Sequence, residues 1–320
     1  ATGRLRDQPK NKTTLTQAEF YAHGKLLLTG EYFVLDGATA LALPTRPGQH
    51  LKASYSPEPG VLYWSSYEQG LNPWLEARFR LRDFELLSSN LEEEGRKLQV
   101  ILRQVRKINQ GFLLKRQGVN VNTRMEFDRH WGLGSSSTLI SCLARWAGVD
   151  AYELQQATFG GSGYDIACAT AGEPLFFQLH KGRPRVHTAA FYPPFAQHLY
   201  FVYLGQKQNS REGIKAYRSV GDISASVHLR ISAISRQLCE TERFDRFCEL
   251  LLEHENLVAA RVGLPRAQDL HFSDFPGLIK SLGAWGGDFV LAASPWSQKK
   301  TREYFKEKGF APVFRYSEMV

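Results

Sequence analysis

The spacing of the hydrophobic residues changes several times along the first half of the chain. Between residues 20 and 84, short runs rich in Val, Leu, Tyr and Phe are separated by Gly, Pro and Asn, which is typical of β-strands. Over 88–108, apolar residues recur at helical spacing, and Ser88 or Ser89 is expected to cap that helix. Alternating residues over 118–127 then predict another strand.

The same kind of change continues to the end of the chain. A turn of glycines and serines over 131–137 precedes a predicted helix that ends at Gly148. Further segments predict a helix (150–158), a hairpin (173–187), a strand (198–205), helices near 222–239, 243–262 and 297–308, and a last strand. Strands and helices mix without strict alternation, which favours an α+β fold. We expect a flexible tail over 1–19 and two domains, 20–190 and 191–320.

Composition narrows the class of protein. The 320 residues are 43% hydrophobic and 22% charged, which is typical of a globular chain. No run approaches the roughly 20 apolar residues of a membrane span. The polar first 19 residues predict no signal peptide, and four scattered cysteines suit the reducing cytoplasm, so we expect a cytoplasmic protein. The net charge of +8 favours anionic partners, but no basic block with interleaved aromatics predicts nucleic-acid binding.

Three turns hold more small residues than packing requires: 23–31 (HGKLLLTGE), 132–137 (GLGSSS) and 283–288 (GAWGGD). In the second, glycines let the backbone turn and three serines occupy the first turn of a helix. Free N–H groups, the helix dipole and hydroxyls then form an anion site, where a serine can also ligate Mg²⁺. The alternative is an ordinary helix cap.

Two side chains near these turns are candidates for chemistry. Asp165 follows the glycine turn 160–163 and could accept a proton from a substrate hydroxyl, although an aspartate there is more often a turn residue. Lys25 lies in a strand-like apolar run and could be a fixed cation beside a carboxylate or a phosphoryl group. Its alternative is a solvated position on an open face.

Taken in order, the three turns resemble the three motifs of the GHMP kinases, over roughly residues 20–295. The resemblance implies a two-domain α+β fold, with an N-terminal domain like ribosomal protein S5 domain 2, a ferredoxin-like C-terminal domain and ATP in the cleft between them. It implies Asp165 as base and Lys25 as its cationic partner. The remaining site residues implied are Gly132, Leu133, Gly134, Ser135, Ser136 and Ser137 for ATP, Ser136 for Mg²⁺, and Lys25, Ser162, Gly163, Asp165, Gly286 and Gly287 for the substrate, with Gly283 near both.

Within the superfamily, the segment GSGYDIACATAG (161–172) is most similar to phosphomevalonate kinases. Its GYDIA motif (163–167) is similar to that of a bacterial subgroup. The chain departs from the family in three places. His130 and Trp131 stand where a proline is usual. Eleven residues before Asp165, where mevalonate kinases carry a Mg²⁺-binding glutamate, stands Leu154, with Glu153 adjacent. Trp285 replaces a small residue of the third motif and is expected to crowd the cleft.

The resemblance implies an ATP- and Mg²⁺-dependent kinase of the isoprenoid precursor pathway. It would transfer the γ-phosphoryl group to a hydroxyl or phosphate of a small anionic acceptor, mevalonate or phosphomevalonate. Two alternatives stay open: a diphosphomevalonate decarboxylase, and a catalytically silent relative that binds ligand and regulates a partner. No nucleic acid or membrane is expected as a partner, and a homodimer stays open.

Overall fold

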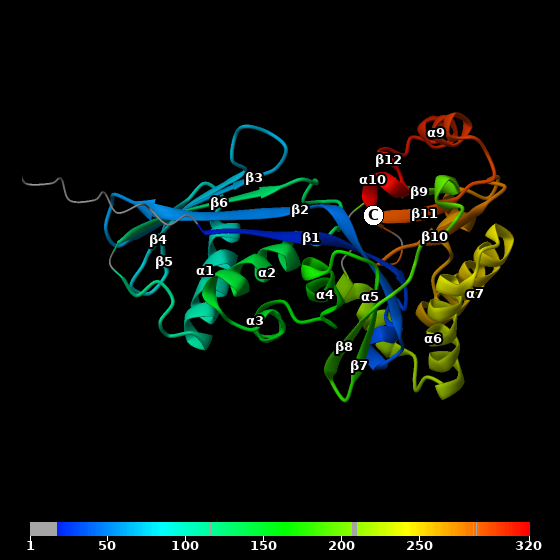
Figure 1. Ribbon diagram of the computed structural model, residues 1–320, viewed down its shortest axis with the longest axis horizontal. Helices are drawn as coiled ribbons and strands as arrows, with labels where there is room; N and C mark the ends of the chain where they lie inside the picture. The colour runs from blue at the N-terminus through cyan, green and yellow to red at the C-terminus, as the bar shows by residue number, and fades with distance from the viewer. Residues whose placement is uncertain (1–17, 116, 207–209, 284, 286) are drawn as a thin grey trace, which may run out of the picture.

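The computed structural model describes residues 18–115, 117–206, 210–283, 285 and 287–320 (Figure 1). Two β-sheets lie along its longest axis, one built from the first half of the chain and one from the second. Of the expected tail, residues 1–17 lie outside the described part, while Ala18 and Glu19 already belong to the first strand. The α+β fold expected from the sequence is confirmed.

The larger sheet has eight strands in the order β5-β4-β3-β6-β2-β7-β8, with β1 paired to β2 beside this path. All pairs are antiparallel except β3 with β6. Its strands are β1 (Ala18–Thr29), β2 (Ala40–Ser56), β3 (Val61–Tyr67), β4 (Leu75–Arg80), β5 (Glu85–Ser89), β6 (Gly118–Met125), β7 (Leu175–His180) and β8 (Arg183–Thr188). The helices between them are η1 (Phe33–Asp36), α1 (Glu92–Ile108), α2 (Ser135–Ala147), α3 (Ala151–Thr158) and α4 (Tyr164–Thr170).

The smaller sheet has the order β10-β11-β9-β12 and is antiparallel throughout. Its strands are β9 (Leu199–Tyr203), β10 (Leu278–Ser281), β11 (Phe289–Ala293) and β12 (Val313–Arg315). The helices of this half are η2 (Ala196–His198), α5 (Ser210–Ser219), α6 (Ala225–Glu240), α7 (Phe244–Val262), α8 (Ala267–His271), α9 (Gln298–Glu307) and α10 (Tyr316–Met319).

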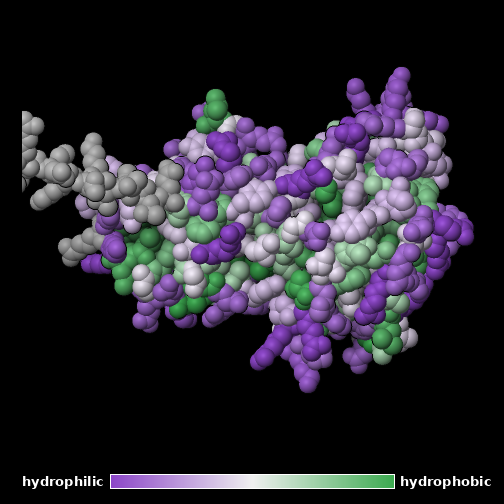
Figure 2. Space-filling model, viewed as in Figure 1, coloured by the Kyte–Doolittle hydropathy of each residue, from purple (hydrophilic) through white to green (hydrophobic). Residues whose placement is uncertain are grey.

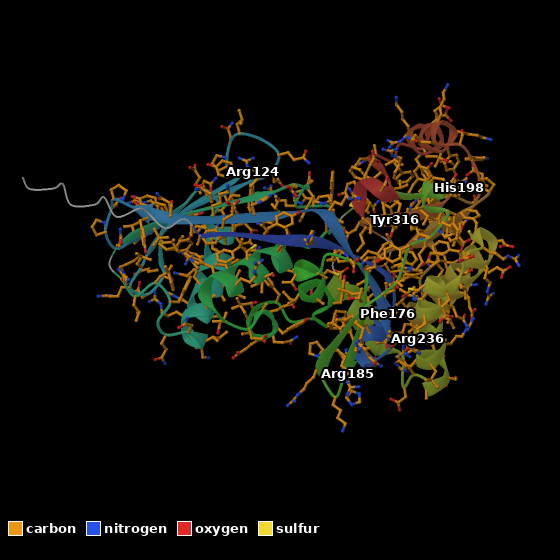
Figure 3. All side chains as sticks on the ribbon, viewed as in Figure 1. Arg124, Phe176, Arg185, His198, Arg236 and Tyr316 are labelled. Atoms are coloured by element: carbon orange, nitrogen blue, oxygen red, sulfur yellow. The ribbon has the colours of Figure 1, made fainter. Side chains whose placement is uncertain are left out.

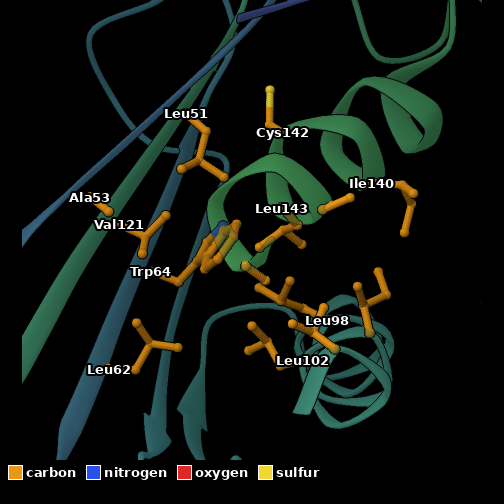
Figure 4. Packing of buried hydrophobic residues seen from close by; sticks show 14 of the residues in the cluster. Leu51, Ala53, Leu62, Trp64, Leu98, Leu102, Val121, Ile140, Cys142 and Leu143 are labelled. Atoms are coloured by element: carbon orange, nitrogen blue, oxygen red, sulfur yellow. The ribbon is translucent and has the colours of Figure 1, made fainter. Parts of the chain in front are cut away.

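Helices α1 and α2 cover one face of the larger sheet (Figure 4). Trp64 of β3 is 1% exposed and packs with Leu98 of α1 and Leu143 of α2. Helix α2 ends as predicted, because Gly148 adopts a left-handed φ of 64° and its N–H closes the last turn. Near the start of α2, the Thr138 hydroxyl donates to Gln49 Oε1 of β2 at 2.6 Å, which holds this end of the helix against the sheet.

The expected serine cap of α1 is wrong. Ser88 and Ser89 end strand β5 and pair with β4, and the helix begins at Glu92 after Leu91 as N-cap. Three glutamates in the first turn, residues 92–94, stand at the positive end of the helix dipole instead.

A second hydrophobic cluster joins the two sheets. Leu26 of β1 and Leu43 of β2 pack in one cluster with Phe201 of β9 and Leu291 of β11. Phe176 and Tyr316, labelled in Figure 3, pack against the same cluster. The expected boundary at residue 190 falls in the connection between β8 and β9, and a division into two domains there stays a prediction.

The face seen in Figure 2 is mostly hydrophilic, including the projecting β7–β8 hairpin, in which every residue of β8 is at least partly exposed. Within the described ranges, no helix is both long and apolar enough to cross a membrane.

Candidate functional site

The first and second glycine-rich turns meet at Lys25. Its backbone N–H donates to the Leu133 carbonyl at 2.9 Å, and its Nζ donates to the Gly132 carbonyl at 2.7 Å. A Cβ on Gly24 would lie 2.9 Å from the same Leu133 oxygen and 2.4 Å from Thr45 Oγ1, so only glycine permits this approach. Strand β1 therefore holds the ammonium of Lys25 against the 132–137 loop.

The third turn reaches the same loop through Asp288. Gly132 has a φ of +70°, and a Cβ there would lie 2.3 Å from Asp288 Oδ2. Trp131, at the position where the resemblance expects proline, packs edge-on against Phe289 of β11 with ring centroids 6.0 Å apart. The structure thus brings all three sequence motifs together, and an aromatic contact fixes the loop on the second sheet.

Helix α2 begins with backbone donors that no side chain caps. Its N-cap is Gly134, with φ +96°, and no side-chain hydrogen bond caps the helix. Ser136 is exposed and Ser135 half-buried, whereas the Ser137 hydroxyl is buried and donates to the Gly134 carbonyl at 3.1 Å. Ser135 and Ser136 can therefore offer hydroxyls to a ligand, but Ser137 offers its backbone N–H alone.

Both of these serines line a cavity of about 960 Å³. Its walls include Trp64, Trp74 and Leu98, and the guanidinium of Arg129 lies over the Trp74 ring, 4.6 Å from its centroid. The volume is within the range of small-molecule sites and its walls are partly aromatic, as ligand sites usually are. The uncapped helix end and this cavity form one continuous surface.

Asp165 lies in the first turn of α4, after the glycine turn that the sequence singled out. Gly163 is the N-cap with φ +94°, and a Cβ there would lie 2.9 Å from the Tyr152 ring of α3. The carboxylate accepts from the Ile166 N–H at 3.0 Å and from Gln155 Nε2 at 3.0 Å on each oxygen. The fold thereby fixes the carboxylate from two helices.

Lys25 remains a cation in this setting. Burial opposes its charge, but the nearby carboxylates of Asp288 and Asp165 favour the ammonium, and the pKa of Lys25 lies above its ordinary value. Burial likewise raises the pKa of Tyr164 to about 12, so its hydroxyl stays neutral at neutral pH. The Lys25 ammonium and the Asp165 side chain therefore belong to one site and interact electrostatically.

Neither residue weighed as the missing metal ligand faces Asp165. Leu154 is fully buried in the core of the larger sheet, and Glu153 is exposed on α3. Gln155, the next residue, takes the position beside the carboxylate. No cluster of three His, Cys, Asp or Glu side chains suited to a metal occurs in the described part of the chain.

A second cavity, of about 390 Å³, lies beside the glycine turn that precedes Asp165. Ser162, Glu153 and Gln156 line it together with Arg218 of α5. Ser162 is itself buried, and its hydroxyl accepts from the Tyr164 N–H at 3.4 Å. Candidate substrate residue Ser162 is thus next to a cavity that carries both a cation and an anion.

The expectation that Trp285 crowds the cleft is wrong. Its ring is 5% exposed and packs in a cluster with Tyr32, while its Nε1 donates to the Pro265 carbonyl at 3.0 Å. The tryptophan therefore fills a core and lines neither cavity. Gly283 has a φ of +67° and Gly287 is buried, whereas Gly286 lies outside the described residues.

Glu31, in the first motif, forms a buried ion pair that links the two halves of the chain. Its Oε1 lies 2.6 Å from Lys280 Nζ on β10, and Gly30 N–H donates to His254 Nε2 at 2.9 Å. Burial raises the pKa of Glu31 to about 7, and burial followed by Lys280 lowers the pKa of His254. His254 is therefore neutral, with Nε2 as acceptor.

Sequence reasoning did not find Gln155, Tyr164 or Asp288 as site residues. Asp288 carried a weak signal, since it ends the third glycine-rich turn. Tyr164 is adjacent to Asp165 but had no pattern of its own. Gln155 had none either, because its contact depends on the angle between α3 and α4.

No family model matches the sequence, and no curated protein matches it. Solved structures do match. Mevalonate kinase of Leishmania major, in complex with R-mevalonate, superposes with a TM-score of 0.69 at 16% identity over 92% of this chain and 93% of its own. Mevalonate kinase of Methanococcus jannaschii gives 0.69 at 15% identity over 93% and 97%.

Phosphomevalonate kinase of Streptococcus pneumoniae, in complex with phosphomevalonate and AMPPNP, gives a TM-score of 0.68 at 15% identity over 93% of this chain and 99% of its own. Identities this low establish architecture alone. The resemblance based on the three motifs is thereby confirmed at the level of the fold: the chain has the α+β fold of mevalonate and phosphomevalonate kinases, which are GHMP kinases.

Proposed function

We propose that the protein is an ATP-dependent small-molecule kinase. The observation that carries the proposal is that the fixed ammonium of Lys25 contacts the loop before the uncapped N-terminus of α2 and interacts electrostatically with the fixed Asp165 carboxylate. Phosphoryl transfer needs little else from a protein than a base and positive charge in the right places. A silent ligand-binding relative would have no use for the pair Lys25 and Asp165.

The residues present fit a magnesium nucleotide. Free N–H groups of the first turn of α2 and the exposed Ser136 hydroxyl suit phosphate oxygens, and the 960 Å³ cavity has room for a nucleoside. Mg²⁺, when bound, would neutralise charge on the phosphates, with Ser136 as its protein ligand. Gly132, Leu133, Gly134, Ser135 and Ser137 complete the proposed nucleotide loop.

In the reaction, the acceptor oxygen bonds to the γ-phosphorus while the bond from that phosphorus to the ADP oxygen breaks. The proton of the acceptor hydroxyl passes to the Asp165 carboxylate. Lys25 keeps its proton and stabilises the charge on the transferred group. With a phosphate acceptor that is already ionised, Asp165 would orient the acceptor and accept no proton.

The proposed acceptor is anionic, mevalonate or phosphomevalonate. The net charge of +8, Arg218 in the cavity beside Ser162, and the mevalonate and phosphomevalonate kinases among the structural matches support this choice. Gly163, Gly286 and Gly287 stay candidate substrate contacts.

ADP release tests the proposal, with Mg-ATP and a panel of mevalonate, phosphomevalonate, diphosphomevalonate, homoserine and sugars. We expect turnover with mevalonate or its phosphate. Turnover of neutral sugars alone contradicts the choice of acceptor. Release of CO₂ together with ADP from diphosphomevalonate identifies the decarboxylase alternative, and ATP binding without any ADP release identifies the silent relative.

A further inference from the structure

The side-chain amide of Gln155 contacts both oxygens of the Asp165 carboxylate. Nε2 lies 3.0 Å from Oδ1 and 3.0 Å from Oδ2, and Gln155 is 4% exposed. An ionised carboxylate only accepts hydrogen bonds, so the amide nitrogen must face it. A donor shared by both oxygens stabilises the ionised form of the acid and restrains its rotation.

A packing role alone does not explain this glutamine. Its Oε1 is buried and has no hydrogen-bond partner among the described residues. A buried polar atom without a partner costs about 1–3 kcal/mol, a cost that a leucine of similar size would avoid. The amide is therefore useful at this position for what its nitrogen does to Asp165.

Several other groups face Asp165 and must be considered with it. They are Lys25 from β1, Tyr152 from α3, and Tyr164 and Cys168 from α4. Burial raises the pKa of both tyrosines to about 12 and raises the pKa of the Cys168 thiol, so these three are neutral near pH 7. Lys25 is the cation of this group, and Gln155 supplies the direct hydrogen bonds.

We propose that Gln155 is the positioning residue of the base, and that its amide fixes the orientation of the Asp165 carboxylate by donating to both of its oxygens. The inference rests on the proposed function, because it assigns a role within the same site. An acid at position 155 would compete with Asp165 for one proton, whereas the glutamine amide does not.

The test is carboxyl ¹³C NMR of the full chain labelled at aspartate, with Asp165→Asn used to assign the Asp165 signal. In Gln155→Leu we expect the midpoint of the Asp165 titration to be higher than in the unaltered protein, because two hydrogen bonds to the carboxylate are lost. Gln99→Leu is the matched control, since it removes another buried amide, one that donates to the Phe84 carbonyl at 2.9 Å. Its Asp165 midpoint should equal that of the unaltered protein.

Stability separates this role from a structural one. The free energy of unfolding of Gln155→Leu should stay within about 1 kcal/mol of the unaltered value, because a buried orphan oxygen disappears with the lost bond. If Gln155→Leu does not fold, Gln155→Glu keeps the shape of the side chain and should make residues 155 and 165 share a proton, so that the pair releases its protons in two separate steps.

Kinetics add the functional readout. In Gln155→Leu, kcat at pH 7 should fall about tenfold, with an unchanged KM for Mg-ATP and a shift of the acid limb of the pH profile to higher pH. An unchanged Asp165 midpoint in Gln155→Leu overturns the inference whether or not the protein is a kinase. An inactive parent protein with a shifted midpoint instead refutes the proposed function and leaves the role of Gln155 intact.

Discussion

Gly132→Ala tests whether the contact between the second and third motifs matters for nucleotide binding. The alanine Cβ would be 2.3 Å from Asp288 Oδ2 and 2.4 Å from its Cγ, at a backbone φ of +70°. Because the atoms met belong to the end of a side chain, the carboxylate can turn away. The Asp288 carboxylate then moves away from the 132–137 loop and no longer stabilises the positive charge of Lys25. The Nζ of Lys25 is hydrogen-bonded to the Gly132 carbonyl in the same loop.

Gly148→Ala is the matched control, at the other end of helix α2. Its φ is +64°, and a Cβ there meets no atom within 4 Å. Both variants carry the left-handed strain of an L-residue, about 1–2 kcal/mol in urea unfolding. We expect the KM for Mg-ATP to rise at least about tenfold in Gly132→Ala, equivalent to about 1.4 kcal/mol, and to stay unchanged in Gly148→Ala. Equal nucleotide affinity in the two variants would refute the role assigned to the Asp288 contact.

Three further predictions follow from the site and its surroundings. Ser136→Ala should raise the KM for Mg-ATP in steady-state assays, whereas Ser136→Thr, which keeps the hydroxyl, should retain most of the affinity; equal effects argue against a Mg²⁺ ligand. Lys25→Met should lower kcat, and combining it with Asp165→Asn should cost less than the two separate losses multiplied, because the residues act as a unit. Because the pKa of Glu31 is raised in the folded protein, this group contributes its full stabilisation of the fold at pH values below 4.5, its ordinary pKa. The contribution is lost as the pH rises through about 7. The stability advantage over Glu31→Gln should therefore fall between those pH values, by up to about 3 kcal/mol in urea unfolding at each pH, and a constant difference contradicts the raised pKa.

The sequence predicted the elements whose pattern is local. The end of helix α2 at Gly148, the β7–β8 hairpin and helix α7 all follow from residues a few positions apart in the sequence. Helix α5 was missed, since its short segment has few apolar positions and packs through Tyr217 on Phe33 of the other half. Its stability comes from a tertiary contact that no local window contains.

In the candidate site too, local features could be predicted from the sequence and tertiary ones could not. Glycine-rich turns reveal themselves in the sequence because glycine is needed where the backbone turns or approaches another chain segment closely, as at Gly24 and Gly132. Glu153 was weighed as a metal ligand by counting residues, but on a helix each step turns a side chain by about 100°. The difference between Glu153 and Gln155 is therefore a matter of helix orientation, which counting does not supply.

The measurement that tests the central claim most directly is ADP release by Asp165→Asn with Mg-ATP and the acceptor that the unaltered protein uses. The substitution keeps the shape of the side chain and removes its basicity. We predict that kcat falls roughly 10²–10⁴-fold while the KM for Mg-ATP barely changes. Asp245→Asn, an exposed position on α7 with the same change in charge, should keep normal turnover. Near-normal turnover by Asp165→Asn with that acceptor would contradict the assignment of Asp165 as the base.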